Sequence, residues 1–279
     1  MGTTNYNLPK ISGTASVKVP RDVNALADAV DQTLNLQLMD VRKNTLKSVF
    51  TAHRGLNNAF PENTLLAFEM ACLAGYKVIE LDIQPSAEGV LVVHHDLTLE
   101  RMTNGAGQVS AQTLSQLKTL TIDGGIAANE YPNIKIPTLE ETLALFRRYN
   151  VKPMIEFKLI NDYAQLNTLV DLLKVYGMEY NSSIISPVTY LIREFRARGG
   201  KSECLYLNSV TPESTALLKE YGNCGYCLNY LSTTESLVKA IHAENLSVAV
   251  YTVNDVSIAR NLSRWGVEYI TTDTIRGVS

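Results

Sequence analysis

Short apolar runs alternate with helix-like stretches along most of this 279-residue chain. The runs that predict strands cover residues 48–53, 77–83, 90–95, 153–158, 183–186, 204–208, 226–230, 247–253 and 268–272. Helical spacing of apolar residues occupies most of the intervals between them, at 63–75, 163–176, 189–198, 212–221, 234–244 and 255–265. Repeated β–α units joined by short links predict a parallel sheet, and about eight of them predict a closed α/β barrel.

Local signals support these helix boundaries. Asn63 and Asp255 are good helix starts, and so is the Thr211-Pro212-Glu213 opening. A glycine follows several of the helical runs, as is typical just beyond the last helical turn, at residues 75, 177, 199, 222 and 266.

Residues 1–46 differ from the rest and are predicted to form a separate N-terminal extension to a main domain at 47–279. The first 21 residues are polar and are broken by Pro9, Gly13 and Pro20. Asp22 is a plausible N-cap for an amphipathic helix over about 23–43. Its apolar stripe has two open interpretations: it packs on the main domain, or it packs on copies of itself in a homo-oligomer.

Composition excludes several classes of protein. Hydrophobic residues make up 46% of the chain and charged residues 19%, which suits an ordinary globular core. The net charge of -3 and the absence of a Lys/Arg cluster argue against a nucleic-acid surface. No run of 18 apolar residues predicts a membrane span, and no signal peptide is visible, so we expect a chain that is cytoplasmic when made.

The four cysteines do not form a disulfide framework in a chain of this size. Cys224 and Cys227 have the spacing of a redox motif, but Cys227 sits in an apolar run. We therefore expect buried, reduced thiols.

Charged residues stand at the ends of the predicted strands. His53, Glu80, Asp82, His95 and Glu156 all lie within a residue or two of a strand end, where the active sites of α/β barrels form. Glu80 and Asp82 share a strand face, because side chains along a strand alternate with period two. Their carboxylates would repel each other unless a cation neutralised them. A divalent, oxygen-preferring cation fits, with Glu156 as a natural third ligand.

Each residue also has an ordinary structural interpretation. A lone Glu-x-Asp pair is more often a solvated edge charge, a lone histidine in an apolar run is usually a core residue, and Arg54 alone could serve a structural ion pair. Their joint occurrence at strand ends favours a catalytic cluster for metal-assisted phosphoryl chemistry.

The chain resembles the glycerophosphodiester phosphodiesterase family over about residues 48–276. The matching pieces occur in unbroken order and are His53-Arg54-Gly55, Pro61-Glu62-Asn63-Thr64, Glu80-Leu81-Asp82, Val92-Val93-His94-His95-Asp96, Arg101-Met102-Thr103-Asn104-Gly105-Ala106-Gly107, Ile136-Pro137-Thr138-Leu139-Glu140-Glu141, Glu156-Phe157-Lys158, Val250-Tyr251-Thr252-Val253-Asn254 and Ile270-Thr271-Thr272-Asp273.

The resemblance implies a TIM-type barrel with an insertion after the second strand, here at about 85–135. It also implies hydrolysis of glycerophosphodiesters to an alcohol and glycerol phosphate, dependent on Ca²⁺ or Mg²⁺. The resemblance implies three metal ligands, Glu80, Asp82 and Glu156. It implies that His53 and His95 form the acid/base pair, with His94 only a neighbour. It also implies that Arg54 and Lys158 bind the phosphate. Glu62 and Tyr251 complete the expected substrate contacts, with Tyr251 standing where these enzymes usually carry tryptophan.

In this family the nucleophile is thought to be the neighbouring glycerol hydroxyl, which gives a cyclic phosphate that water then opens. Two other functions are weighed against hydrolysis of glycerophosphodiesters. One is a phospholipase D-like lipid phosphodiesterase or lyase, and the other is a non-catalytic module that binds a glycerol phosphate polymer.

The opening of the chain, around 6–11 and 19–27, is similar to some bacteriophage tail and baseplate proteins. This shorter resemblance implies a virion component, anchored or trimerised by residues 1–46. Such a component would cut poly(glycerol phosphate) teichoic acid of a Gram-positive host.

Overall fold

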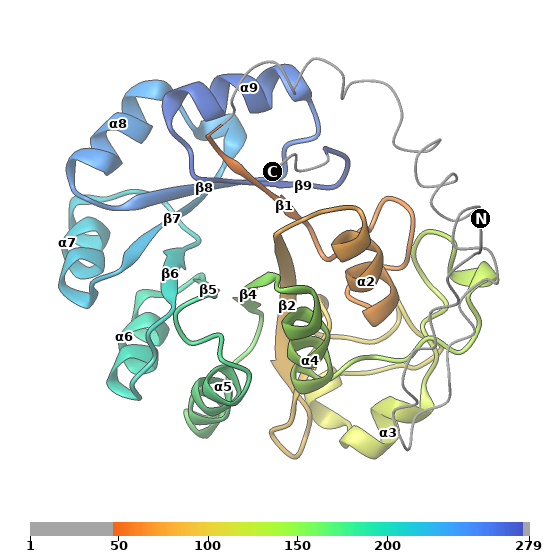
Figure 1. The fold of residues 1–279 in the computed structure, drawn as a ribbon. Helices are drawn as coiled ribbons and strands as arrows, with labels where there is room; N and C mark the ends of the chain where they lie inside the picture. Colours follow the sequence, from red (N-terminus) through yellow and green to blue (C-terminus); the bar gives the residue numbers. More distant parts are fainter. Residues whose placement is uncertain (1–46, 276–279) are drawn as a thin grey trace.

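Eight parallel strands close into a barrel, with helices around its outside (Figure 1). The computed structural model describes residues 47–275. The barrel strands, in chain order, are β1 (Val49–Ala52), β2 (Val78–Pro85), β4 (Lys152–Phe157), β5 (Ser183–Ser186), β6 (Glu203–Tyr206), β7 (Cys224–Asn229), β8 (Ser247–Tyr251) and β9 (Tyr269–Thr272). The barrel closes because β1 pairs with both β9 and β2. The predicted TIM-barrel architecture is confirmed.

One helix follows or precedes each strand and covers its outer face. These helices are α2 (Leu65–Leu73), α4 (Leu139–Tyr149), α5 (Ala164–Val175), α6 (Thr189–Ala197), α7 (Pro212–Tyr221), α8 (Glu235–Ala243) and α9 (Val256–Trp265). Because strand side chains alternate, one set packs against the helices and forms the main apolar core. The other set points into the barrel and forms a second cluster of Val78, Met154, Ile185, Leu205, Cys227 and Ala249.

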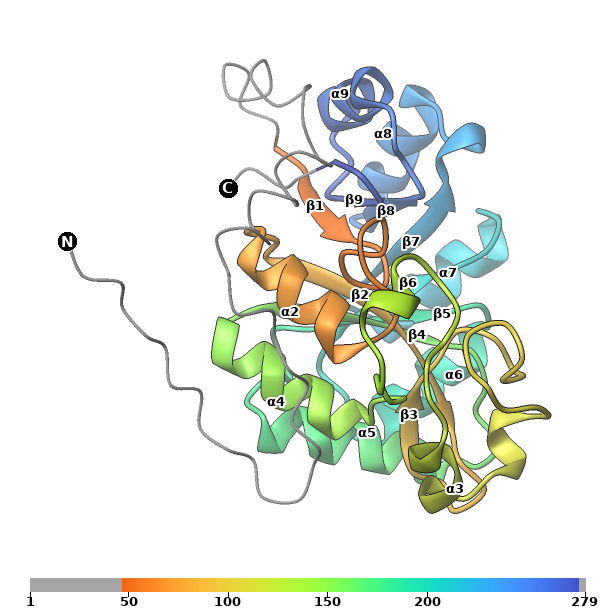
Figure 2. The same ribbon diagram turned by 90° about the vertical axis from the view of Figure 1, so that its right-hand side faces the viewer.

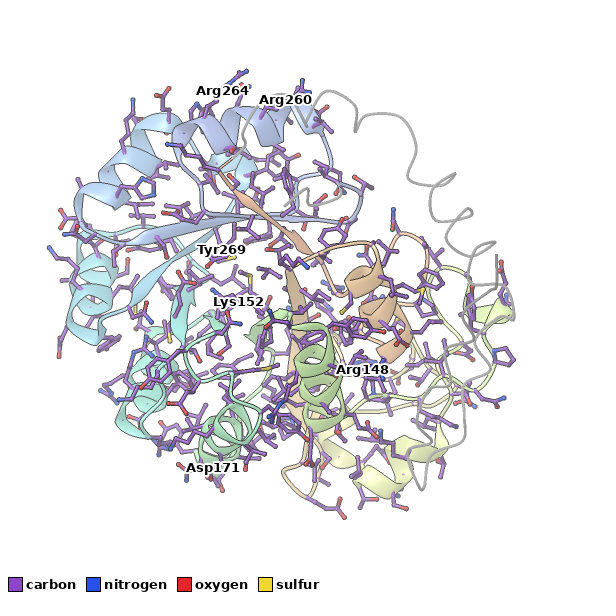
Figure 3. All side chains as sticks on the ribbon, in the orientation of Figure 1. Arg148, Lys152, Asp171, Arg260, Arg264 and Tyr269 are labelled. Carbon is purple, nitrogen blue, oxygen red and sulfur yellow. The ribbon has the colours of Figure 1, made fainter. Side chains whose placement is uncertain are left out.

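The two ends of the barrel interior differ in chemistry. At the end where the strands begin, Glu203 accepts hydrogen bonds from Lys152, Ser183 and Ser247. Lys152 also bonds the hydroxyl of Tyr269, so the polar groups of this end satisfy one another. Figure 3 shows the side chains of Lys152 and Tyr269 inside the ring of helices. The apolar cluster separates this layer from the opposite end, where the strands finish and the loops carry the candidate chemistry.

The insertion expected after the second strand is present between β2 and α4. It holds β3 (Leu91–Val93), η2 (Val109–Ala111), α3 (Leu114–Thr119) and η3 (Ala128–Glu130). β3 runs antiparallel to the end of β2, with Ile83 opposite Val93. This pairing attaches β3 to the carboxyl end of β2 and brings the loop after β3 to the ends of the parallel strands (Figure 2).

One helix was not predicted, and one predicted helix cap is wrong. Helix α4 was not predicted, although Thr138 and Glu141 form a capping box at its start. Asn63 does not cap α2: Thr64 does, with its side chain accepting from the backbone N–H of Ala67. Asn63 instead has φ 55° and directs its side chain to the barrel mouth.

Other expectations agree with the structure. The glycines after the helices at 75, 177, 199, 222 and 266 all have positive φ. All four cysteines are free thiols; three of them are buried, and Cys72 is only partly buried. Within 47–275, no helix is long and apolar enough to cross a membrane. The amphipathic helix predicted near 23–43 lies outside the described residues.

Candidate active site

Three carboxylates meet at the mouth of the barrel. Glu80 and Asp82 come from the inner face of β2, and Glu156 comes from the neighbouring strand β4, where it lies opposite Asp82 in the parallel register. One oxygen from each lies within 4.8 Å of the others. Glu80 and Asp82 are almost fully buried, with 3% and 1% exposure. The structure therefore brings together the three predicted metal ligands.

The electrostatics of this acidic trio (Glu80, Asp82 and Glu156) are strained. Burial raises the pKa of Glu80 well above its ordinary value, and the charges of Asp82 and Glu156 raise it further. Burial and the charge of Asp82 likewise raise the pKa of Glu156. Burial also opposes ionisation of Asp82, but Lys158 and Arg54 outweigh it and hold the pKa of Asp82 below its usual range. If all three carboxylates were ionised, the trio would carry more negative charge than Arg54 and Lys158 neutralise.

The trio fits a hard divalent cation. Oε1 of Glu80 is buried and accepts no hydrogen bond from the described residues, and Oδ1 of Asp82 is buried with only an ion pair to Nζ of Lys158, at 3.1 Å. A buried carboxylate oxygen without a partner, such as Oε1 of Glu80, is costly, and a cation with oxygen ligands would satisfy it. The donor set contains only oxygen, which suits Ca²⁺ or Mg²⁺ better than metals that prefer nitrogen or sulfur.

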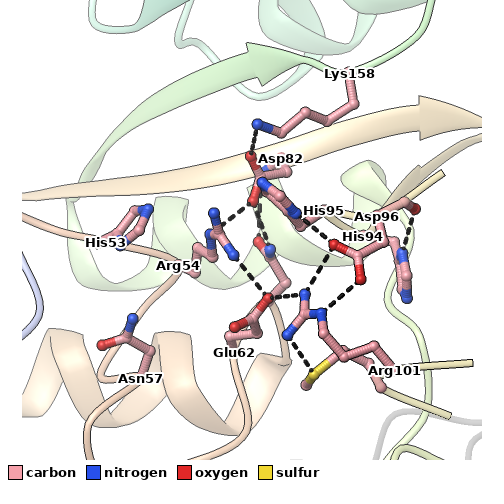
Figure 4. A network of polar contacts seen from close by, with 12 residues as sticks. His53, Arg54, Asn57, Glu62, Asp82, His94, His95, Asp96, Arg101 and Lys158 are labelled. Atoms are coloured by element: carbon pink, nitrogen blue, oxygen red, sulfur yellow. Dashed lines mark hydrogen bonds and ion pairs between the residues drawn. The ribbon is translucent and has the colours of Figure 1, made fainter. Parts of the chain in front are cut away.

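Arg54 is positioned by the tight turn between β1 and α2. Its backbone N–H donates to Oε2 of Glu80 at 3.0 Å, and its Nη1 donates to Oε1 of Glu62 at 2.9 Å. Its Nε lies 3.2 Å from Oδ2 of Asp82. The turn requires Gly55, which has φ 85° and would place a Cβ only 2.7 Å from the backbone of Ala67. Figure 4 shows the resulting network.

Lys158 follows β4 and reaches back to the trio. Its Nζ contacts Oε1 of Glu156 and lies 3.1 Å from Oδ1 of Asp82. Burial disfavours its charge, but Asp82 and Glu156 outweigh that effect and raise the pKa of Lys158. Lys158 therefore places a positive charge on the opposite side of Asp82 from Arg54 (Figure 4).

The two predicted catalytic histidines lie at the same mouth. His53 directly follows β1, and its Nδ1 lies 2.8 Å from Oδ1 of Asp273. His95 follows β3, and its Nδ1 lies 2.6 Å from Oδ1 of Asp96. Both side chains are partly exposed, at 21% and 30%. His94 is instead buried, with Nδ1 bonded to the backbone carbonyl of Asp96, so it has no comparable access to a ligand.

The remaining two predicted residues have different surroundings. Oε1 of Glu62 accepts from both Arg54 and Arg101, so this carboxylate is engaged in holding two guanidinium groups. Tyr251 ends β8 on the face that points into the barrel, and burial is the main cause that raises its pKa. Cys227 and Glu156 raise that pKa further, and the ring packs against the apolar cluster inside the barrel.

Several residues of the site were not predicted to take part in it. Asn63 donates from Nδ2 to Oδ2 of Asp82 at 2.7 Å. Asp96 contacts His95 and accepts a hydrogen bond from Arg101. Asp273 contacts His53. All four belong to the matching sequence pieces quoted above. The strand-end rule, if applied to β9, would have found Asp273.

Similarity to known proteins agrees with the site. A model of the glycerophosphoryl diester phosphodiesterase family matches residues 53–276. A glycerophosphodiester phosphodiesterase of Caldanaerobacter subterraneus is 33% identical over 236 residues, which cover 82% of this chain and 95% of that protein. A glycerophosphodiester phosphodiesterase of Bacillus subtilis is 29% identical over 257 residues, covering 80% and 82%.

Solved structures of phosphodiesterases have a similar fold. A phosphodiesterase of Oleispira antarctica in complex with the product sn-glycerol-3-phosphate superposes with a TM-score of 0.74 at 27% identity, covering 81% of this chain and 93% of that one. A glycerophosphodiester phosphodiesterase of Agrobacterium tumefaciens superposes with a TM-score of 0.71 at 26% identity, covering 81% and 96%.

Fold and site together define a TIM-barrel enzyme with an acidic, cation-compatible cluster at the carboxyl ends of its strands. The chain belongs to the glycerophosphoryl diester phosphodiesterase family and is thus a phosphoric diester hydrolase.

The strained trio predicts that cation binding depends on pH. Without a cation, Glu80 and Glu156 bind a proton more tightly in the folded chain than in the unfolded one, because their pKa values are raised. Stability should therefore fall as pH rises above the ordinary carboxyl value of 4.5. Over the same pH range the contribution of Asp82 to stability does not change, because Asp82 is ionised in both the folded and the unfolded state.

Thermal unfolding with and without Ca²⁺ or Mg²⁺ measures this coupling. A cation present at 100 times its Kd should stabilise the folded enzyme by about 2.7 kcal/mol. The shift in Tm should be larger at about pH 8 than at about pH 5.5, because at the lower pH protons compete with the cation for the trio. Glu80→Gln should reduce the shift at both pH values, whereas Asp171→Asn, on the exposed face of α5, should not. Equal shifts at both pH values would contradict the analysis.

Proposed function

We propose that this enzyme hydrolyses glycerophosphodiesters to an alcohol and glycerol phosphate, and that the reaction depends on Ca²⁺ or Mg²⁺ bound to Glu80, Asp82 and Glu156. The observation that carries the proposal is the meeting of this trio with Arg54, Lys158 and two imidazoles at one barrel mouth. The product named for the Oleispira antarctica neighbour, sn-glycerol-3-phosphate, supports the same substrate class.

Charge at the mouth suits a phosphodiester anion. A cation held by the trio would supply charge stabilisation for the phosphoryl oxygens and polarise the phosphorus–oxygen bonds. Arg54 and Lys158 lie on either side of Asp82 and add two positive charges there. We assign both to phosphate binding, with Glu62 orienting the guanidinium of Arg54.

The two histidines supply proton transfer. Each has Nδ1 engaged by a carboxylate, and none of the described residues forms a hydrogen bond with Nε2 of either ring. In the proposed reaction, Nε2 of one ring accepts the proton of the attacking hydroxyl, and Nε2 of the other donates a proton to the leaving alkoxide oxygen. Imidazole suits both roles, because its ordinary pKa lies near neutrality.

Tyr251 is assigned to the wall that contacts the glycerol or alcohol group. It stands inside the mouth beside β7 and β9, on the other side of the trio from His95 and the insertion. Its ring is smaller than the tryptophan usual in the family, so this wall differs in shape from that of the relatives. That difference bears on which alcohol group the enzyme accepts.

Hydrolysis assays test the reaction and its cation requirement. Purified protein is incubated with glycerophosphocholine, with lysophosphatidylcholine and with purified glycerol teichoic acid, each with Ca²⁺, Mg²⁺ or EDTA. We expect release of glycerol phosphate from glycerophosphocholine with a cation, and a loss of at least about 100-fold after chelation. Activity that survives thorough chelation would refute the metal assignment. Cleavage of the lysolipid alone would favour the lipid phosphodiesterase, and no turnover would favour a binding module.

Adjacent histidines offer a matched test of the acid/base assignment. His95→Gln should lower kcat by about 100-fold or more, because one proton-transfer group is lost. His94→Gln should cost stability, since His94 is buried, and should leave kcat of the folded fraction close to that of the parent. Comparable losses of kcat in both variants, measured on material shown to be folded by circular dichroism, would refute the assignment of His95.

A more specific role is also proposed, on sequence grounds. We propose that residues 1–46 anchor or trimerise the enzyme in a bacteriophage tail and that its polymeric substrate is glycerol teichoic acid, whose repeat contains the same diester. These residues lie outside the part of the chain that the structure describes. Light scattering on the full chain and on a chain starting at Lys47 tests the assembly: we expect trimers only with the extension, and two monomers would contradict it.

A further inference from the structure

Asp273 lies beside His53 because two neighbouring strands end at the same level. β1 and β9 are parallel and in register through Ala52 and Thr272, so the next residues on each strand, His53 and Asp273, are side by side. The backbone N–H of His53 donates to the carbonyl of Thr272 at 3.0 Å, which continues the register into the loop. Oδ1 of Asp273 then lies 2.8 Å from Nδ1 of His53.

Two asparagines hold the Asp273 carboxylate in place. Nδ2 of Asn57, in the loop after β1, donates to Oδ1 at 2.7 Å, and Nδ2 of Asn254, in the loop after β8, donates to Oδ2 at 2.8 Å. Asn254 also accepts from the backbone N–H of Asp273 at 2.8 Å. The loops after β1 and β8 therefore both converge on this one side chain, although it is neither a predicted metal ligand nor a predicted phosphate contact.

The donors around Asp273 determine the tautomer of His53. Burial alone would raise the pKa of Asp273, but the hydrogen bonds from His53, Asn254 and Asn57 hold it well below its usual range. An ionised carboxylate can only accept hydrogen bonds, so Nδ1 of His53 must carry the proton. In the neutral ring Nε2 is then the unprotonated nitrogen, free to accept a proton from a hydroxyl group.

The partner of His95 differs in one respect. Asp96 also accepts from an imidazole, but it is engaged at the same time by Nε and Nη2 of Arg101, at 2.5 and 3.0 Å. Its negative charge is therefore largely neutralised by a guanidinium. In the described residues no arginine or lysine pairs with Asp273, whose other side-chain partners are neutral amides. Of the two rings, His53 is the one backed by an uncompensated carboxylate.

We propose that Asp273 is a positioning residue for the phosphodiesterase reaction, held by Asn57 and Asn254, and that it fixes His53 with Nδ1 protonated and Nε2 directed to the substrate as the proton acceptor. This inference rests on the proposed catalytic role of His53. A carboxylate that orients an imidazole also stabilises the imidazolium formed when the ring takes up a proton. Asp273 acts only through His53 and makes no contact with the reacting atoms.

Substitution of Asp273 gives the first test. Asp273→Asn preserves shape but removes the charge and allows the amide to donate to Nδ1, which would favour the wrong tautomer. We expect kcat for glycerophosphocholine to fall by about 100-fold with KM unchanged, because only the proton-transfer step is affected. Asp171→Asn removes the same charge from the outer face of α5, where Figure 3 shows the side chain at the edge of the molecule, and should leave kcat unchanged.

A double-mutant cycle separates this inference from the proposed function. Asp273→Asn should cause no further loss in a His53→Ala background, because it has nothing left to orient. A loss of the same factor in both backgrounds, or full kcat in Asp273→Asn while His53→Ala is inactive, would overturn the role of Asp273 alone. Full activity of His53→Ala would instead overturn the assignment of His53, and the positioning role with it.

The tautomer can be measured in the parent enzyme, so the inference does not depend on whether a variant folds. The chain has four histidines, which makes ¹⁵N-labelled imidazole spectra tractable, and His53 is assigned by the signal that disappears in His53→Ala. At a pH where the ring is neutral, we expect Nδ1 to be protonated and Nε2 to show the shift of an unprotonated nitrogen. A ring protonated on Nε2 would overturn the inference.

Discussion

Mutual repulsion among three carboxylates at the barrel mouth is the constraint on which the site depends. Glu80 and Asp82 are nearly inaccessible to water, and Glu156 lies beside them on the next strand. Ionised groups in that position must be compensated, because the protein interior solvates charge poorly. Arg54 and Lys158 compensate part of the charge, and Oε1 of Glu80 remains without a hydrogen-bond donor among the described residues. The same constraint explains both the two partly buried cations, Arg54 and Lys158, and the suitability of the trio for a divalent metal.

The insertion supports this centre from one side. Arg101 binds Asp96 and Glu62 together, and Glu62 in turn holds Arg54. A continuous set of ion pairs thus runs from Asp96, which contacts His95, to Arg54, whose guanidinium lies beside Asp82 (Figure 4). On the opposite side, neutral asparagines hold the carboxylate that contacts His53. The two imidazoles have the same local geometry but different electrostatic surroundings, which suits a reaction that needs one proton acceptor and one donor.

Much of the fold was predictable because local patterns and barrel geometry agree. Apolar runs, helix caps and terminal glycines indicated the alternation of strands and helices, and the alternation predicted the barrel. Helix α4 was not predicted, although Thr138 and Glu141 carry a clear capping signal. Asn63 was assigned to the helix start on residue type alone, but Thr64 took that role and left Asn63 to bind Asp82.

The sequence by itself determined which side chains stand at strand ends and which of them share a strand. Glu80 and Asp82 face the same way because strand side chains alternate, and no tertiary information is needed for that conclusion. Only the tertiary structure decided that Glu156 lies opposite Asp82 and that Asp273 lies beside His53. The physical reason is that strand register and barrel closure depend on contacts between segments far apart in the chain. Such contacts leave no periodic signal in any one segment.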